Sequence, residues 1–180
     1  MEKKLKYLVI GAGGTGGPIG GYLARAGKDV TLIARGRHME AMKAHGLEIE
    51  LGGEAFVDPV KACSMEEYKE TADVIFVCVK GYSLEEAAEF IKKAADAHTV
   101  VIPILNIYGT GGKLQEMLPD ITVTDGCIYI ASQIKEPGKI LMSGKIFRVD
   151  YGLRKDTSKE IEEKVMPVLK RIETDLKEAR

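Results

Sequence analysis

The hydrophobic residues of this chain fall into short continuous runs, and these runs alternate with longer segments of mixed polarity. The runs that predict buried strands cover residues 5–10, 29–34, 73–79 and 99–105. Strands this apolar are typical of a parallel sheet that helices cover on both faces. The segments that predict helices cover residues 15–26, 39–45 and 84–95. The alternation predicts an α/β fold: a Rossmann-like, doubly wound and mostly parallel sheet with flanking helices.

Two short strands are predicted in the middle of the chain. They cover residues 47–51 and 55–57, and the Gly52-Gly53 pair between them is typical of a hairpin turn. The stretch that follows, residues 61–71, carries little pattern and predicts only a short helix.

The next part of the chain predicts further strands. Residues 121–132 are rich in strand-forming side chains. Residues 139–142 and 145–149 are predicted to pair as a C-terminal β-hairpin. This hairpin would turn at Ser143-Gly144 and add antiparallel strands to the sheet.

The last segment carries one apolar stripe at helical spacing, which predicts an amphipathic helix. The stripe consists of Ile161, Val165, Val168, Leu169, Ile172 and Leu176. Pro167 lies inside this pattern and is expected to kink or divide the helix. We expect the helix to pack on its own domain. A partner subunit, as in a homodimer, or a second domain is the alternative that the stripe leaves open.

A glycine-rich turn follows the first predicted strand and begins the first predicted helix. Gly11, Gly13 and Gly16 have the G-x-G-x-x-G spacing of dinucleotide-binding proteins. The first glycine permits the tight turn, the second lets a pyrophosphate approach the backbone, and the third lets helix and strand pack closely. Free N–H groups at the helix start would face the phosphates. The residues expected to bind the dinucleotide are Gly11, Ala12, Gly13, Gly14, Thr15 and Gly16.

The residues after the second predicted strand indicate which dinucleotide binds. An NAD site usually has Asp or Glu at this point, which bonds the ribose 2′-hydroxyl. This chain has Ala34-Arg35-Gly36-Arg37 instead. An arginine pairs with a 2′-phosphate through charge-assisted hydrogen bonds, whereas a carboxylate would repel it. The sequence therefore favours NADP, with Arg35 ahead of Arg37 as the phosphate ligand. The alternative is that both are solvated loop cations.

Two further polar residues stand at the ends of predicted strands. In an open parallel sheet, ligands bind outside the carboxyl ends of the strands, so Lys80 is expected to face cofactor or substrate. The alternative is a solvated lysine at a strand end. Asn106 can hydrogen-bond a carboxamide, a hydroxyl or a keto oxygen, or it can cap a helix that starts near Gly109. The glycine cluster of residues 109–112 lacks the spacing of the first cluster and predicts a loop.

Composition and charge exclude several other classes of protein. The 180 residues, with 45% hydrophobic and 29% charged side chains, fit one soluble domain over residues 1–180. A net charge of −1 gives no basis for binding nucleic acid, and no apolar run approaches the ~20 residues of a membrane span. Cys63, Cys78 and Cys127 are widely spaced, which predicts free thiols in a reducing cytoplasm. The histidines are scattered, so we expect no metal site.

Together these motifs resemble the ketopantoate reductase family. The resemblance rests on residues 11–16, 32–36, 79–82 and 104–106 in this order, followed by Gly126, Ala131-Ser132 and Pro137-Gly138. It implies NADPH-dependent reduction of 2-dehydropantoate, a small 2-oxo acid, to pantoate in pantothenate biosynthesis. It also implies that the glycine turn holds the pyrophosphate and Arg35 the 2′-phosphate. Lys80 and Asn106 would lie near nicotinamide and substrate, and the backbone of Ala131 and Ser132 would line the cofactor crevice.

The chain departs from the family pattern in two respects. Family members usually have Gly directly after the Asn, whereas this chain has Ile107, which bears on substrate placement. They also continue into a helical second domain that carries a general-acid lysine and a substrate-binding carboxylate, and this chain stops at Arg180. Lys80 is the one local candidate for proton donation. We therefore expect the cofactor half of a reductase. The alternatives are a reductase of another 2-oxo acid and a non-catalytic NADP-binding module that acts through a partner.

Overall fold

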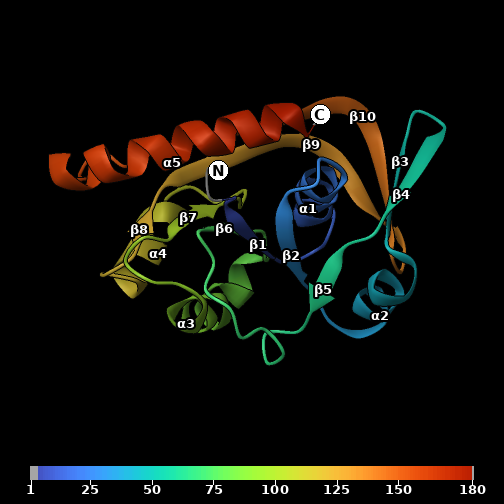
Figure 1. The fold of residues 1–180 in the computed structure, drawn as a ribbon, viewed down its shortest axis with the longest axis horizontal. Coiled ribbons are helices and arrows are strands. Elements are labelled where there is room, and N and C mark those ends of the chain that lie inside the picture. Colours follow the sequence, from blue (N-terminus) through green and yellow to red (C-terminus); the bar gives the residue numbers. More distant parts are fainter. Residues whose placement is uncertain (1–3, 180) are drawn as a thin grey trace.

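Six parallel strands form the central sheet of the computed structural model, which describes residues 4–179 (Figure 1). They lie in the order β5, β2, β1, β6, β7, β8. Their bounds are Lys6–Ile10 (β1), Asp29–Ile33 (β2), Lys61–Cys63 (β5), Val74–Val77 (β6), Val100–Pro103 (β7) and Thr122–Val123 (β8). From β1 the chain builds outward through β2 to β5, then returns to β6 on the other side of β1. The predicted α/β fold with a doubly wound parallel sheet is confirmed, and its topological switch lies between β1 and β6.

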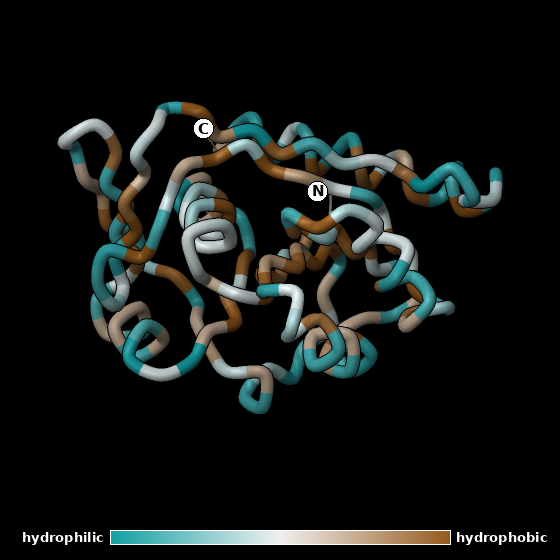
Figure 2. Tube along the Cα trace, turned by 180° about the vertical axis from the view of Figure 1, so that it is seen from behind, coloured by the Kyte–Doolittle hydropathy of each residue, from teal (hydrophilic) through white to brown (hydrophobic). Residues whose placement is uncertain are grey.

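Helices cover both faces of this sheet. Their bounds are Gly16–Arg25 (α1), Gly36–His45 (α2), Leu84–Ala94 (α3) and Thr110–Met117 (α4), with a 3-10 turn at Gly81–Ser83 (η1). Successive strand residues point to opposite faces. Leu8 and Ile10 of β1 therefore pack in the core under α3 and α4, whereas Tyr7 and Val9 pack in the core shared with α1. In Figure 2 the central strands are brown and the outer helices carry teal. The apolar runs thus serve two cores, one on each side of the sheet.

A second sheet of four strands packs on the other side of α1. Its order is β4, β3, β10, β9, and its bounds are Leu47–Leu51 (β3), Glu54–Asp58 (β4), Asp125–Glu136 (β9) and Lys139–Gly152 (β10). Glycines let α1 fit between the two sheets. A Cβ on Gly20 would lie 2.6 Å from the Leu32 side chain of β2. A Cβ on Gly21 would lie 2.6 Å from the Ile49 side chain of β3. Both sides of this helix therefore need residues without a side chain.

The predicted hairpin at Ser143-Gly144 is wrong. β10 is one strand paired antiparallel with β9, and the chain turns earlier, at Gly138. Ser143 and Gly144 lie instead in a bulge, since β10 advances five positions between Met142 and Phe147 while β9 advances two. β10 also pairs parallel with β3, so these strands belong to the second sheet and do not extend the first. The β9–β10 pairing continues on both sides of the bulge. Ser143 and Gly144 therefore lie within β10 and do not form the turn of a hairpin.

Two other local predictions are wrong and one is confirmed. Residues 61–71 form no α-helix, because they begin with the edge strand β5 and continue through turns. Residues 109–112 are not a loop: Gly109 is the N-cap of α4, and the helix begins at the next residue. The hairpin turn at Gly52-Gly53 is confirmed, with positive φ at both glycines and β3 paired antiparallel with β4.

The C-terminal helix α5 (Lys159–Glu178) is continuous and runs along one side of the molecule (red in Figure 1). Pro167 lies inside it without dividing it. Val165, Leu169 and Ile172 are buried in the core shared with α1 and both sheets. The prediction that this helix packs on its own domain is confirmed.

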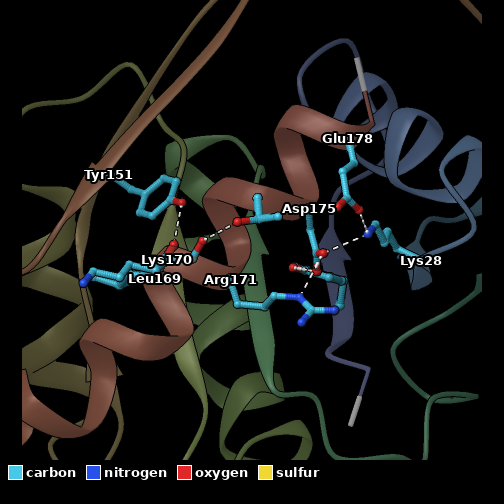
Figure 3. Close-up of polar contacts among 9 residues, drawn as sticks. Lys28, Tyr151, Leu169, Lys170, Arg171, Asp175 and Glu178 are labelled. Atoms are coloured by element: carbon cyan, nitrogen blue, oxygen red, sulfur yellow. Dashed lines mark hydrogen bonds and ion pairs between the residues drawn. The ribbon is translucent and has the colours of Figure 1, made fainter. Parts of the chain in front are cut away.

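A buried carboxylate fixes the end of α5 to the central sheet (Figure 3). The Asp175 side chain is 3% exposed. Its Oδ2 accepts a hydrogen bond from the Tyr7 hydroxyl of β1 at 2.7 Å. Its Oδ1 accepts from Lys28 Nζ at 2.8 Å and from Arg171 Nε at 3.2 Å. Lys28 also pairs with Glu178 one turn further along the helix. The charge is thus buried with partners from three parts of the chain.

The Asp175 carboxylate should make stability depend on pH. Burial works to raise its pKa, but the hydrogen bonds from Lys28 and Tyr7 outweigh burial and hold the pKa of Asp175 below its ordinary value. The unfolded chain binds this proton more readily. The stabilisation is therefore fully present above about pH 4 and is lost as the pH falls through the lower folded-state pKa. In acid titrations of unfolding free energy, we expect a steeper loss below about pH 4 for the unchanged chain than for Asp175→Asn. Parallel curves would contradict this linkage.

Three expectations concern cysteines, membranes and metals. Cys63, Cys78 and Cys127 are free thiols, as predicted. Among the helices of residues 4–179, none has the length and apolar content needed to cross a bilayer. Within the same residues, no three His, Cys, Asp or Glu side chains group in a way that could hold a metal ion.

Candidate functional site

The carboxyl ends of the parallel strands meet at one edge of the central sheet. Ile10 of β1 is in register with Ile33 of β2 and with Val77 of β6. The segments that follow stay side by side, because the Gly11 N–H donates to the Ile33 carbonyl at 3.1 Å and the Cys78 N–H to the Ile10 carbonyl at 2.8 Å. The glycine turn therefore lies at the switch point, where open α/β sheets bind their ligands.

The three fingerprint glycines have different surroundings. Gly11 has φ +96°, and a Cβ there would lie 2.9 Å from the Cys78 carbonyl oxygen. A Cβ on Gly16 would lie 1.9 Å from the Gly11 carbonyl oxygen, so the start of α1 packs against the turn. A Cβ on Gly13 would meet nothing within 4 Å. Thr15 occupies the N-cap of α1 and its side chain makes no capping hydrogen bond, while the Gly17 N–H donates to the Gly13 carbonyl at 2.7 Å. The turn thus offers open backbone at its second glycine, next to a helix start that has no side-chain cap.

Strand β9 runs along this edge from β7 to the glycine turn. Near its beginning, a Cβ on Gly126 would lie 2.7 Å from the Pro103 carbonyl oxygen at the end of β7. Further along, a Cβ on Gly14 would lie 2.6 Å from the Ser132 carbonyl oxygen. The Ser132 hydroxyl also donates to the Gly14 carbonyl. Ala131, the residue before, is exposed. The structure therefore brings Ala131 and Ser132 beside the turn.

Arg35, Lys80 and Asn106 follow three of the parallel strands at the same edge. Arg35 directly precedes α2, Lys80 precedes η1, and Asn106 lies between β7 and α4. All three are exposed, and none has a side-chain hydrogen bond or ion pair with any residue in the described part of the chain. The alternative that Asn106 caps α4 is wrong, because Gly109 takes the N-cap position. Two cations and one amide therefore remain available for a ligand.

Ile107 adds apolar surface next to these polar groups. A Cβ on Gly81 would lie 2.6 Å from its Cδ1, so Ile107 lies over the segment that follows β6. Tyr82 and Tyr108 beside it are also highly exposed. The Ile107 side chain thus covers the start of η1, next to Lys80.

Cys78 lies beneath the glycine turn. Its Cβ is 3.0 Å from the position of a Cβ on Gly16. Burial raises the pKa of its thiol far above the usual range. The side chain packs against the core that the central sheet shares with α1.

Sequence reasoning missed His38 in α2. Its ring contacts the Ala12 carbonyl in the glycine turn and the Gly138 N–H between β9 and β10. These partners are 26 and 100 positions away in sequence, and no local spacing marks them.

A cavity of about 640 Å³ lies elsewhere in the fold. It is lined by Ala97 and Thr122, at the beginnings of β7 and β8, and by Ser158 and Ile161 at the start of α5. The cavity therefore opens at the amino ends of the strands, opposite the glycine turn.

Comparisons with known proteins agree with this arrangement. The sequence matches the family "Ketopantoate reductase PanE/ApbA" over residues 7–155. An uncharacterized oxidoreductase, YkpB, of Bacillus subtilis is 33% identical, over 82% of this chain and 48% of its own length. A 2-dehydropantoate 2-reductase of Mesorhizobium japonicum is 34% identical, over 79% of this chain and 51% of its own.

Solved structures of 2-dehydropantoate 2-reductases are also similar to this chain. A 2-dehydropantoate 2-reductase of Porphyromonas gingivalis has a TM-score of 0.81 and 28% identity, over 98% of this chain and 62% of its own. The chain spans about half the length of the curated relatives it matches. The family match covers both the glycine turn and β9, the two segments that form the candidate site. The chain therefore belongs to the ketopantoate reductase PanE/ApbA family, a family of pyridine-nucleotide-dependent oxidoreductases.

Proposed function

We propose that this chain is the NADPH-binding domain of a 2-dehydropantoate 2-reductase. The proposal rests on the different surroundings of the glycines in the turn. Backbone packs against Gly11, Gly14 and Gly16, whereas the Cβ position of Gly13 faces open space. A pyrophosphate can approach main-chain amides through such an opening, and the start of α1 adds its partial positive charge.

Arg35 favours NADPH over NADH. It follows β2 directly, where a carboxylate would bind an unmodified ribose, and its side chain is exposed and unpaired within residues 4–179. A guanidinium can form two parallel hydrogen bonds with a 2′-phosphate. NADH lacks this phosphate, so Arg35 is the residue that distinguishes the nucleotides.

Lys80 and Asn106 are the groups of this chain that would meet the substrate. When bound, the nicotinamide of NADPH supplies a hydride to the C2 carbon of a 2-oxo acid. The keto oxygen then needs a proton and a partner for its developing charge. The Lys80 ammonium can hold that proton, and the Asn106 amide can orient the carbonyl. Relatives named 2-dehydropantoate 2-reductase support ketopantoate as the acid.

The remaining groups of the proposed enzyme lie outside this chain. Relatives are about twice as long, which supports a second domain that supplies the principal general acid and completes the substrate site. On this proposal residues 1–180 bind and orient the cofactor in the cytoplasm. The chain alone should therefore bind NADPH but reduce a panel of 2-oxo acids slowly or not at all. Reduction of ketopantoate by this chain at a full-length enzyme's rate would contradict the proposal that the principal general acid lies in a second domain.

Replacing Arg35 by alanine should separate the two nucleotides. In calorimetric titrations, we expect Arg35→Ala to weaken NADPH binding by about 10- to 100-fold, which is about 1.4–2.8 kcal/mol, and to change NADH binding by less than about twofold. Lys93→Ala is the charge-matched control, because Lys93 is exposed in the last turn of α3, near the amino ends of the strands. Equal affinity of the unchanged chain for both nucleotides would contradict the phosphate assignment.

A further inference from the structure

His38 connects the glycine turn to the second sheet. It lies in the first turn of α2 and is half-buried. Its Nε2 is 2.8 Å from the Ala12 carbonyl oxygen, and its Nδ1 is 3.0 Å from the Gly138 backbone nitrogen. Ala12 is the residue before Gly13, and Gly138 is in the turn between β9 and β10. The His38 ring thus connects the candidate nucleotide site to the turn between β9 and β10, which is 100 positions away in sequence.

The two partners determine the tautomer of the ring. A backbone N–H can only donate, so Nδ1 must accept from Gly138 and carry no proton. A carbonyl oxygen can only accept, so Nε2 must carry the proton and donate it to Ala12. Both ring nitrogens are satisfied only in the neutral Nε2–H form of His38.

The bond to Ala12 orients the next peptide group. The peptide bond between Ala12 and Gly13 is trans and planar, so its carbonyl and its N–H point in opposite directions. Holding the carbonyl toward His38 therefore sets the direction of the Gly13 N–H. This amide belongs to the one fingerprint glycine whose Cβ position is open.

The bond to Gly138 attaches the ring to a well-packed turn. Gly138 has φ +77°, and a Cβ there would lie 3.0 Å from the Ala41 Cβ of α2. Its carbonyl accepts from the Glu48 N–H of β3 at 2.9 Å. The turn is therefore held from two sides and can serve as a fixed support for His38.

We propose that His38 is a positioning residue for the nucleotide pyrophosphate. Its Nε2–H fixes the Ala12 carbonyl and thereby the Gly13 amide, while the Nδ1 contact with Gly138 holds the ring in place. This role rests on the proposed function, because it concerns the same nucleotide site. Nucleotide affinity then depends on His38, a residue of α2 that contacts the glycine turn although it lies outside the G-x-G-x-x-G sequence.

Two substitutions separate the two ring contacts. Glutamine places its amide nitrogen near the position of Nε2, so His38→Gln keeps a donor for Ala12. Asparagine places its amide oxygen near the position of Nδ1, so His38→Asn keeps an acceptor for Gly138 but is too short to reach Ala12. We expect NADPH affinity within about threefold of the unchanged chain for His38→Gln, and about tenfold or more weaker for His38→Asn.

The comparison distinguishes positioning from a purely structural role. If His38 only stabilised the fold, the two variants would lose affinity in proportion to their loss of unfolding free energy, which denaturant titration measures. Equal NADPH affinity for the two variants, or weaker binding by His38→Gln, would overturn the proposal.

A nucleotide-free measurement keeps this inference separate from the proposed function. Long-range ¹H–¹⁵N spectra of the unchanged chain should show the Nε2–H tautomer. The Gly13 amide resonance should shift in His38→Asn and remain in place in His38→Gln. If these results appear and the unchanged chain fails to bind NADPH, the proposed function is wrong while the orienting contact stands. An Nδ1–H tautomer would overturn the inference itself.

Discussion

Replacing Asp175 by alanine is expected to lower the free energy of unfolding by about 2–4 kcal/mol. The Asp175 carboxylate is 3% exposed and accepts hydrogen bonds from Tyr7, Lys28 and Arg171. Without it, the Tyr7 hydroxyl remains at the centre of the sheet with no acceptor, because the Tyr7 residue is fully buried. Lys28 keeps a partner in Glu178, so the main cost arises from the buried hydroxyl and the lost anchor of α5.

The size of this effect is large against the whole stability of a domain, which is about 5–15 kcal/mol. Glu173→Ala is the matched control, since Glu173 lies on the same helix and pairs with Lys177 on the surface. Such an exposed pair is screened by solvent and contributes little to stability. Urea titration of both variants measures the difference. A loss for Asp175→Ala within about 1 kcal/mol of the control would show that α5 is held by apolar packing alone.

The parts of the fold that were predicted correctly have local causes. β1, β2, β6 and β7 are apolar runs that would be buried in any arrangement of this type. The glycine turn is also local, because its spacing, the strand before it and the helix after it all lie within 20 residues. The position of Arg35, Lys80 and Asn106 also has a local cause, because each follows a predicted strand and the strand ends meet at one edge. Their role in binding stays a prediction.

The parts that were missed depend on distant partners. β10 pairs with β3 across about 90 residues of sequence, and that pairing gathers the strands into a second sheet. The same ladder keeps Ser143-Gly144 in a bulge although the pair resembles a turn. β5 is only three residues long, and its pairing with β2 makes it a strand. His38 was dismissed as a scattered histidine because neither of its partners is near it in sequence.

The second sheet also holds the glycine turn in place. Ser132 of β9 bonds to Gly14, and Gly138 at the end of the same hairpin bonds to His38, which holds Ala12. The glycine turn is thus held by β1 and α1 from within its own βαβ unit and by β9 and β10 from outside. On the proposed function, changes in the hairpin should alter nucleotide binding although the hairpin is remote from the fingerprint in sequence.

Alanine substitutions of Gly13 and Gly16 should give opposite results, although both glycines belong to the same fingerprint. A Cβ on Gly13 meets open space at a φ that other residues accept, so Gly13→Ala should keep or raise the free energy of unfolding by up to about 1 kcal/mol. Its methyl group would occupy the approach to the pyrophosphate, and we expect NADPH affinity to fall by about 100-fold or more.

A Cβ on Gly16 would lie 1.9 Å from the Gly11 carbonyl oxygen, so Gly16→Ala must displace backbone and should cost about 2–3 kcal/mol of stability. Gly152→Ala is the matched control, equally open but at the far end of β10 from Met142, the residue paired with Ser132. Calorimetry and denaturant titration of the three variants measure both quantities, and unaltered NADPH binding by Gly13→Ala would remove the basis for the nucleotide site.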